Sequence, residues 1–421
     1  MAERWAVDGD PAGVAERARG LAPAAESVRD AVADIVGRVR SGGDGAVRDY
    51  TQLLDTRGAE APPLRVGPDE LAGALAALDA DVRAGLVTAA ANVAAVARAG
   101  LRETQELTLD QGQRILLREV PVGRAAVYVP GGRAPYPSTV VMGVVTARES
   151  GVGEVAVCAP PAADGQVHPT ILAACALTGA DEVYRMGGAQ AVAALAFGTD
   201  TVAAVDVIVG PGNLYVQEAK RQVSGQVGTD GFAGPSDVLV VLEGAGVDPR
   251  WVALDLLAQA EHGPGTVVVA VSPDPSLLDA VAGELGDGDA QAPVVLLDAA
   301  DLDEALAVAE AFAPEHLQLV GERAEALAPR VSRAGCVFVG PAGATAFGDY
   351  VAGSNHVLPT GGAARFASAL SPAHFRRRMS EVHVGAAAPA LAAAGAPVAR
   401  AEGFVLHAES MEARMGEDRR P

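Results

Sequence analysis

The segment Gln259-Ala-Glu-His-Gly-Pro264 combines a side-chain amide with an imidazole near the end of a predicted helix. Trp251 to Leu257 have the apolar spacing of a helix, which Gly263 and Pro264 would end. Gln259 and His262 would then share one face of the last turn, where the helix carbonyl groups favour a nearby cation. A capping histidine beside an exposed glutamine is the simpler interpretation of this fragment alone. The spacing differs from the His-Glu-x-x-His of zinc proteases, which disfavours a hydrolytic site of that kind.

A second pair of titratable groups, Glu315 and His316, follows Pro314, where a predicted helix stops and a strand begins. A carboxylate and an imidazole side by side can divide the work of a base, one taking a proton from the substrate and the other from water. Taken alone, the pair is explained equally well as an acid and a histidine on a surface turn.

Two further segments bring acids and histidines together. The stretch Gly348–Gly362 is too rich in Gly, Asn and Pro to be a regular element, and Glu402 to His407 places another acid and histidine near the C-terminus. Polar loops of this kind are where sites are usually built. Four of the seven histidines lie near acids or in such loops: His262, His316, His356 and His407. We interpret the other three, His168, His374 and His383, as surface or packing residues.

Three glycine-rich turns each follow a predicted strand or lead into a predicted helix: Val129-Pro-Gly-Gly132, Gly187-Gly-Ala-Gln190 and Gly210-Pro-Gly-Asn213. Backbone amides at such turns can cradle a phosphate. None of the three is a complete Gly-x-Gly-x-x-Gly. The turn that begins at Gly210 has the first two glycines of that motif, but Tyr215 stands where the third would be. Plain strand-to-helix turns remain an alternative for each of them.

The elements that must position these residues follow the rhythm of a parallel sheet. We predict buried strands that alternate with helices, which indicates two α/β units. The predicted strands are 125–129, 154–158, 206–209, 238–242, 267–271, 294–297, 317–320 and 336–339, and the helices of the first series are 138–150, 167–179, 189–196 and 213–223. Residues 1 to about 115, and those from Ser371 onward, are expected to be mostly helical. The Ala/Pro-rich segment Ala386 to Pro397 could be a linker.

The composition excludes several classes of protein. Among 421 residues, 53 are acidic and 32 are Lys or Arg, so the formal charge is −21, which disfavours a nucleic-acid binder. We find no uncharged run long enough for a membrane span and no secretory signal, and we expect a cytoplasmic protein. The three cysteines fit reduced thiols. For Cys158 we expect a buried structural thiol, because its neighbours offer no base to activate it.

Together the motifs closely resemble the histidinol dehydrogenase family, a zinc- and NAD-dependent family of histidine biosynthesis. The resemblance covers roughly residues 25 to 410. Its strings, in chain order, are Tyr128-Val-Pro-Gly-Gly-Arg, Gly187-Gly-Ala-Gln, Gly210-Pro-Gly-Asn, Ala233-Gly-Pro-Ser, Gln259-Ala-Glu-His-Gly-Pro, Pro314-Glu-His-Leu, Gly348-Asp-Tyr, Asn355-His-Val-Leu-Pro-Thr-Gly-Gly and Glu402-Gly-Phe-Val-Leu-His.

The resemblance implies a metal site and an activity. It implies one Zn²⁺ per subunit, a homodimer whose partner subunit supplies the last ligand, and L-histidinol as the small-molecule substrate. The implied zinc ligands are Gln259, His262, Asp349 and His407, a mixed N/O set that suits zinc with open positions. In the implied reaction L-histidinol is oxidised to L-histidine by two NAD⁺ through a bound aldehyde.

The resemblance also implies individual roles. His316 corresponds to the base that takes the hydroxyl proton, and Glu315 to the base that activates water. The NAD contacts would be Tyr128, Gln190 and Asn213. The substrate contacts would be Ser236, His356 and Glu402 together with Gln259, His262, Glu315, Asp349 and His407.

The expected fold is α/β, with two incomplete Rossmann-like domains with parallel-sheet cores, helical N- and C-terminal arms and an intertwined homodimer. The expected boundaries are 1–24 for an N-terminal helical arm, 25–127 with 237–370 for one domain, 128–236 for an NAD-contacting domain, and 371–421 for a C-terminal helical tail that reaches the partner's active site. Two alternatives remain open: a paralogue that oxidises another amino alcohol, and a zinc amidohydrolase that needs no nicotinamide.

Overall fold

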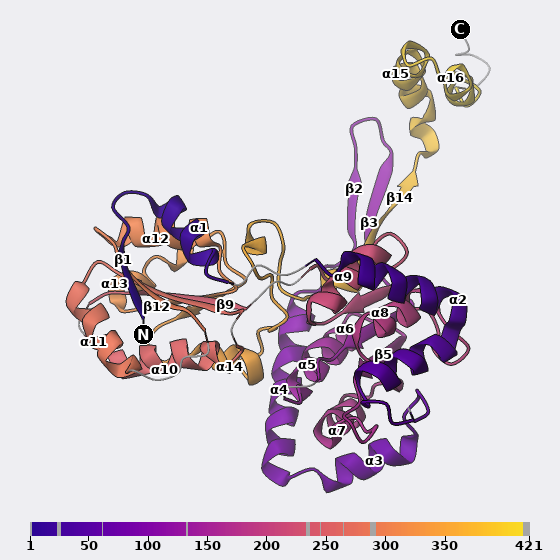
Figure 1. The fold of residues 1–421 in the computed structure, drawn as a ribbon. Coiled ribbons are helices and arrows are strands. Elements are labelled where there is room, and N and C mark those ends of the chain that lie inside the picture. The colour runs from indigo at the N-terminus through magenta and orange to yellow at the C-terminus, as the bar shows by residue number, and fades with distance from the viewer. Residues whose placement is uncertain are drawn as a thin grey trace. The chain divides into compact units, whose positions relative to one another are not determined.

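The computed structural model describes residues 2–415 apart from 23–26, 61, 132–133, 233–235, 245, 264 and 287–291. The chain divides into two compact units, Met1–Gly100 with Val122–Phe375, and Leu101–Pro121 with Arg376–Pro421. Figure 1 shows the elements of both. Some residues of the motifs above lie outside the described residues: Gly132, Arg133, Ala233, Gly234, Pro235 and Pro264.

The first unit contains a five-stranded sheet of order β6-β5-β4-β7-β8, with all neighbours parallel. Its strands are β4 (Arg124–Tyr128), β5 (Glu154–Ala159), β6 (Glu182–Arg185), β7 (Val207–Val209) and β8 (Gly228–Thr229). The helical segments that connect them are α5 (Pro137–Val140), the π-helix η1 (Val141–Val145), α6 (Thr146–Glu149), α7 (Pro169–Thr178), α8 (Gly188–Phe197) and α9 (Leu214–Val223). The central strands are continuous buried runs of Val, Ala and Ile, as expected where helices cover both faces.

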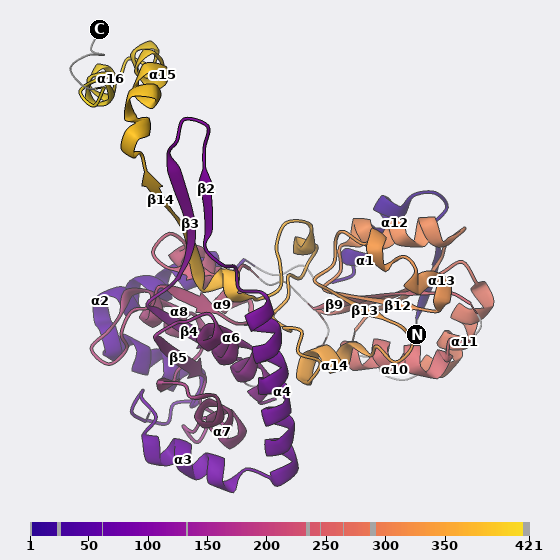
Figure 2. The same ribbon diagram turned by 180° about the vertical axis from the view of Figure 1, so that it is seen from behind.

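Three further helices pack on the helices of this sheet (Figure 2). Helix α2 (Arg29–Leu54) packs against α8 and α9, α3 (Pro68–Ala77) against α7, and α4 (Ala80–Ala99) against η1 and α6. Helix α4 is apolar and long enough, by length and composition alone, to cross a membrane. It buries Leu86, Ala89, Val93, Ala94 and Ala97 in the protein, while Val82, Val87 and Val96 are exposed.

The first unit also contains a six-stranded parallel sheet of order β1-β11-β10-β9-β12-β13. Its strands are β1 (Glu3–Ala6), β9 (Asp237–Leu242), β10 (Val267–Ser272), β11 (Val294–Asp298), β12 (His316–Val320) and β13 (Cys336–Val339). The helices that belong to it are α1 (Pro11–Arg19), α10 (Pro249–Ala260), α11 (Pro275–Leu285), α12 (Leu302–Phe312), α13 (Glu322–Glu325) and α14 (Thr345–Tyr350). The predicted α/β class with parallel sheets is confirmed.

The N-terminal residues differ from the expected helical arm. Besides helix α1 they form strand β1, which pairs with β11 so that Glu3 lies opposite Val295. Trp5 and Val7 are buried on one side of this strand, and Arg4 forms an ion pair with Asp298. Helices α2, α3 and α4, expected to share a domain with residues 237–370, pack instead on helices of the five-stranded sheet. The domain boundaries themselves stay a prediction.

The second unit is a three-stranded antiparallel sheet followed by two helices. The sheet has the order β14-β3-β2, from β2 (Gln105–Thr108), β3 (Arg114–Pro121) and β14 (Arg376–His383). The helices α15 (Ala388–Ala401) and α16 (Val405–Glu412) pack on each other through Ala396, Ala399, Ala408 and Met411.

Two predictions for the second unit were wrong. The residues from 371 onward are not wholly helical, because β14 pairs with β3 along its length and cross-strand ion pairs such as Arg118 with Glu381 stabilise the pairing. The expected linker Ala386–Pro397 is mostly helix α15, since its alanines have the highest helix propensity.

Candidate active site

The predicted catalytic residues and the predicted substrate contact Ser236 lie at the amino ends of two neighbouring strands. Glu315 directly precedes β12, His316 is its first residue, and Ser236 directly precedes β9. Strands β9 and β12 are paired, with His316 opposite Val238. Gln259 lies in the last turn of α10 and His262 just after it, while Asp349 lies near the end of α14. Ligands of open α/β sheets usually bind at the carboxyl ends of the strands, so this site departs from the common arrangement.

A chain of hydrogen bonds connects three of these side chains. Gln259 Nε2 donates to Ser236 Oγ at 2.5 Å, and Ser236 Oγ donates to Glu315 Oε2 at 2.5 Å. The backbone N–H of Asp237 also donates to Glu315 Oε2, at 3.2 Å. Burial raises the pKa of Glu315 to about 8, although the hydrogen bonds from Ser236 and Asp237 act in the opposite direction. A carboxyl with such a pKa exchanges protons near neutral pH, as a general acid or base must.

The side chain of Asp237 holds the backbone of Glu315 in place. Its Oδ1 accepts the backbone N–H of Glu315 at 2.6 Å, and its Oδ2 lies 3.7 Å from Arg19 Nη1. Burial, and then the charge of Glu315, raise the pKa of Asp237 to about 7. The sequence alone did not identify Asp237 or Arg19, because their roles depend on α1 and β9 lying together.

His316 lies buried between two polar partners. Its Nδ1 is 3.2 Å from the carbonyl oxygen of Asp237, and its Nε2 is 3.8 Å from Asp349 Oδ1. When Nδ1 carries the proton and donates to that carbonyl, Nε2 is left as the acceptor. His316 can then act as a base through Nε2, on the side of Asp349.

His356 belongs to the same cluster. Its Nδ1 lies 2.9 Å from the carbonyl oxygen of Asp349, and its Nε2 lies 3.2 Å from Thr139 Oγ1. Its neighbour Asn355 anchors the loop, because Asn355 Nδ2 donates to the carbonyl of Met142 at 3.1 Å in the π-helix η1. Burial lowers the pKa of His356, so the ring is neutral at neutral pH.

The donors in this unit fit a zinc ion chemically. Burial lowers the pKa of His262 while the charge of Asp349 opposes that shift, and a neutral imidazole is the form that coordinates metals. Gln259, His262 and Asp349 then offer an amide oxygen, an imidazole nitrogen and a carboxylate. Within the described ranges, no group of three or more His, Cys, Asp or Glu side chains could by itself hold a metal. Gln259 is not of these types, and His407 belongs to the second unit.

Two predicted site residues lie in that second unit. Glu402 follows the last residue of α15, and His407 lies in α16 with its ring stacked on Phe404 at 5.0 Å between centroids. Both side chains are exposed. The structure therefore brings together Ser236, Gln259, Glu315, His316, Asp349 and His356, and His262 lies near enough to Asp349 for their charges to interact. The contribution of Glu402 and His407 to the site stays a prediction.

The predicted NAD contacts lie at the carboxyl ends of strands of the five-stranded sheet. Tyr128 ends β4, Gln190 lies in the first turn of α8, and Asn213 caps α9 by accepting the backbone N–H of Val216 at 3.2 Å. The phenol oxygen of Tyr128 accepts the backbone N–H of Gly188 at 3.0 Å. This edge is the usual nucleotide side of a parallel sheet.

A buried ion pair supports the Gly210–Asn213 turn. Lys220, the only lysine in the sequence, donates from Nζ to Asp230 Oδ1 at 2.7 Å and to the carbonyl of Gly210. Asp230 Oδ2 accepts the backbone N–H of Gly210 at 2.7 Å. Gly210 has φ 114°, and a Cβ there would lie 2.1 Å from the carbonyl oxygen of Tyr128, so only glycine fits. No motif in the sequence points to this ion pair, apart from Lys220 being the only lysine.

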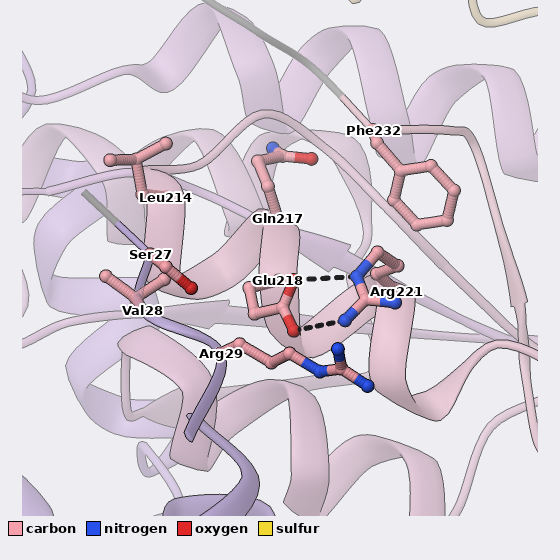
Figure 3. A pocket seen from close by; sticks show the side chains of 8 residues that line it. All are labelled: Ser27, Val28, Arg29, Leu214, Gln217, Glu218, Arg221 and Phe232. Carbon is pink, nitrogen blue, oxygen red and sulfur yellow. Dashed lines mark hydrogen bonds and ion pairs between the residues drawn. The ribbon is translucent and has the colours of Figure 1, made fainter. Parts of the chain in front are cut away.

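A cavity of about 260 Å³ lies along α9 (Figure 3). Its lining residues are Ser27, Val28, Arg29, Leu214, Gln217, Glu218, Arg221 and Phe232. The hydrogen bond from Arg221, on one wall, lowers the pKa of Glu218 to about 2. None of the predicted site residues lines this cavity, although Leu214 directly follows Asn213.

Cys158 lies in the core, and burial raises its pKa to about 12. The prediction of a buried thiol at this position is confirmed. A thiol with such a pKa is not ionised near neutral pH, and therefore it is a poor nucleophile.

Comparison with known proteins gives concordant matches. A model of the histidinol dehydrogenase family matches residues 21–415. Histidinol dehydrogenase of Parasynechococcus marenigrum is 42% identical over 405 residues, covering 93% of this chain and 92% of the relative, and that of Ruegeria pomeroyi is 43% identical over 397 residues, covering 91% of each. The crystal structure of histidinol dehydrogenase from Elizabethkingia anophelis is similar to this fold with a TM-score of 0.88 at 30% identity, covering 95% and 96% of the two chains.

Proposed function

Because the chain belongs to the histidinol dehydrogenase family, we propose that it carries out the NAD-dependent, four-electron oxidation of L-histidinol to L-histidine through bound L-histidinaldehyde. The observation that carries the proposal is the pair of buried side chains Glu315 and His316, with the half-buried Ser236 beside them, at the amino ends of β9 and β12. It offers two bases of different chemical type at one place, and the two oxidation steps need two kinds of proton acceptor.

His316 is proposed to accept the proton of the substrate hydroxyl in the first step. The Asp237 carbonyl, 3.2 Å from Nδ1, fixes the tautomer that leaves Nε2 as the acceptor. The ring is 2% exposed, so bulk water competes little for this nitrogen. NAD⁺, when bound, would accept the hydride that leaves the carbon.

Glu315 is proposed to accept a proton from the water that attacks the aldehyde. Its pKa of about 8 makes the carboxylate a stronger base than an exposed one, and Ser236 and the Asp237 N–H hold Oε2 with two hydrogen bonds. The two side chains are neighbours, because Glu315 Oε2 and His316 Nδ1 are 3.8 Å apart.

Zinc, when bound, would hold the imidazole and amino group of the substrate and so fix the carbon to be oxidised. Gln259, His262 and Asp349 are the proposed ligands from this unit. Gln259 Nε2 is already engaged by Ser236, and this orients the amide so that Oε1 is the atom left for a metal.

A homodimer is part of the proposal, with His407 completing the partner's site. The residues beside His407 support it: Phe404 is 53% exposed, Val405 51% and Leu406 77%. Three large apolar side chains in succession on one exposed helix would be costly in water, and a subunit interface would cover them.

The decisive experiment counts NADH per histidine formed from L-histidinol by the zinc-loaded protein, before and after chelation. Two NADH per histidine, lost on chelation and restored by zinc, is the expected result. Oxidation of other amino alcohols in preference to histidinol would indicate a paralogue with another substrate. Amide hydrolysis without NAD⁺ would indicate a zinc amidohydrolase and overturn the proposal.

A further inference from the structure

Asp55 lies at the C-terminal end of α2, next to the proposed NAD contacts. Helix α2 packs on α8, and Gln190 of α8 points its Nε2 at Asp55 Oδ2 over 3.5 Å. The charge of Asp55 also contributes to the raised pKa of Tyr128, after burial and Cys158, so the two side chains are close. The inference below rests on the proposed use of NAD⁺.

The side chains at this place present hydrogen-bond acceptors. Gln190 is 1% exposed, and within the described part of the chain its Oε1 has no hydrogen-bond partner. The Asp55 carboxylate accepts nothing except the long contact from Gln190 among the hydrogen bonds found in the described residues. A buried acceptor without a donor, such as Gln190 Oε1, is uncommon in folded proteins, and it indicates a ligand that donates. The half-buried carboxylate of Asp55 lies beside it.

The charge at Asp55 disfavours a phosphate as that ligand. Among the described residues, no Lys or Arg forms an ion pair with Asp55. The carbonyl groups at the end of α2 add partial negative charge at the same point. Phosphate oxygens are acceptors and anions, so they would be repelled, whereas a vicinal diol donates two O–H groups to a carboxylate and an amide oxygen.

We propose that Asp55 and Gln190 Oε1 bind the 2′- and 3′-hydroxyls of a ribose of NAD⁺, and that Asp55 thereby selects the cofactor. Where the ribose is that of adenosine, the 2′-phosphate of NADP⁺ would meet the carboxylate directly. An acidic residue that bonds the ribose hydroxyls and rejects a 2′-phosphate is a recurrent solution in dinucleotide folds.

Calorimetry on the full-length, zinc-loaded protein tests the proposal with four probes: NAD⁺, NADP⁺, AMP and nicotinamide mononucleotide. The variants are Asp55→Asn, which keeps the shape and removes the charge, and Gln190→Met, which removes the other acceptor. Asp49→Asn is the matched control, because Asp49 is an exposed acid on the same helix. Thermal unfolding of each variant checks that it folds.

Asp55→Asn is expected to weaken NAD⁺ binding roughly tenfold, as the loss of a charged hydrogen-bond acceptor should. If the ribose is that of adenosine, the variant should bind AMP as well as NAD⁺ more weakly, whereas its affinity for NADP⁺ should not fall. The preference for NAD⁺ over NADP⁺ should then become smaller. If the ribose is that of nicotinamide, the affinity for nicotinamide mononucleotide should fall, and the affinities for NAD⁺ and NADP⁺ should fall by the same factor. Gln190→Met should weaken NAD⁺ without changing the preference.

Unchanged NAD⁺ affinity in Asp55→Asn overturns the inference, and so does a wild-type protein that binds no NAD⁺. Histidinol turnover is measured separately. Turnover that is normal while Asp55→Asn binds NAD⁺ like the wild type refutes only the role of Asp55. NAD⁺ binding that depends on Asp55, without histidinol oxidation, refutes only the proposed function.

Discussion

The hydroxyl of Ser236 donates to Glu315 Oε2 at 2.5 Å while it accepts from Gln259 Nε2 at the same distance. One small side chain thus connects a proposed metal ligand to a proposed base. Because the donor to Glu315 stabilises the ionised carboxylate, Ser236 has a part in setting the basicity of Glu315 as well as its position.

Ser236→Ala should therefore raise the pKa of Glu315 above its value of about 8. Glu315 acts as a base only when it is ionised, so activity rises as the pH passes through that pKa. The variant should therefore reach its full activity at a higher pH than the wild type. We expect kcat at pH 7 to fall roughly tenfold, with partial recovery at alkaline pH. The pH profile of kcat measures this. Ser41→Ala, at an exposed position, is the control. A fall that is the same at every pH would contradict the prediction.

Glu315→Gln should separate the two oxidations. The amide cannot accept a proton from water, so the second step should slow by about 10²–10⁴-fold while His316 still serves the first. Single-turnover experiments should then give one NADH quickly and the second slowly, with aldehyde trapped by a carbonyl reagent. His316→Asn should slow the first NADH instead. Equal slowing of both phases by both variants would contradict the division of roles.

Mixing two inactive variants tests the shared site. Glu315→Gln and His407→Ala should each be inactive as homodimers, because each lacks part of every site. In a mixed dimer, one site combines the intact Glu315 of one chain with the intact His407 of the other. After subunit exchange of equal amounts, roughly a quarter of the wild-type activity should return, since half of the dimers carry one good site of two. No recovery in a verified mixed dimer would show that His407 acts within its own chain.

Lys220→Met should destabilise the protein and weaken NAD⁺ binding. Lys220 and Asp230 are 1% and 6% exposed at their side chains, so the variant leaves a buried carboxylate without its cation, at a cost of about 3–5 kcal/mol in the free energy of unfolding. Lys220→Met with Asp230→Leu should regain much of this stability. Denaturant unfolding measures the stability. In both variants the KM for NAD⁺ should rise, because the turn at Gly210 has lost its hydrogen bond from Lys220 and, in the double variant, also the one to Asp230. Full NAD⁺ affinity in the double variant would exclude that role.

Asp55 gives a pH dependence of stability whose sign is opposite to that of a paired acid. Burial raises its pKa from 3.8 to about 6, so the folded protein favours the protonated form. The group therefore destabilises the fold progressively as the pH rises from about 4 through 6. Allowing for its partial exposure, Asp55→Asn should add ~1–2 kcal/mol to the unfolding free energy at pH 7 without nucleotide, and little at pH 4. Asp49→Asn should show no such difference between the two pH values.

The strands with continuous apolar runs, such as Val238–Leu242 and Val267–Val271, could be predicted from the sequence, since only a buried parallel sheet suits them. Strand β6 was missed because only Val183 and Tyr184 separate its charged ends Glu182 and Arg185. Strand β14 was missed for a related reason: its alternating Arg and Glu residues are stabilised by pairing with β3, a partner distant in the sequence.

The site shows the same limit. Glu315, His316 and Asp349 could be predicted because their motifs are local and resemble a known family. Asp237, Arg19, Asp55 and Lys220 belong to no such motif, and their contacts join segments as distant as α1 and β9. Only the folded chain brings those partners together.

The pairing of β1 with β11 has a consequence for how the chain folds. Among the described residues, strand β1 pairs only with β11, which lies about 290 residues further along the chain at Val294–Asp298. Trp5 and Val7 must therefore stay uncovered through most of synthesis, and the edge of the six-stranded sheet closes late. A nascent chain stalled before β11 would leave Trp5 and Val7 without the sheet that covers them, so this edge of the sheet cannot form until residues 294–298 have been made.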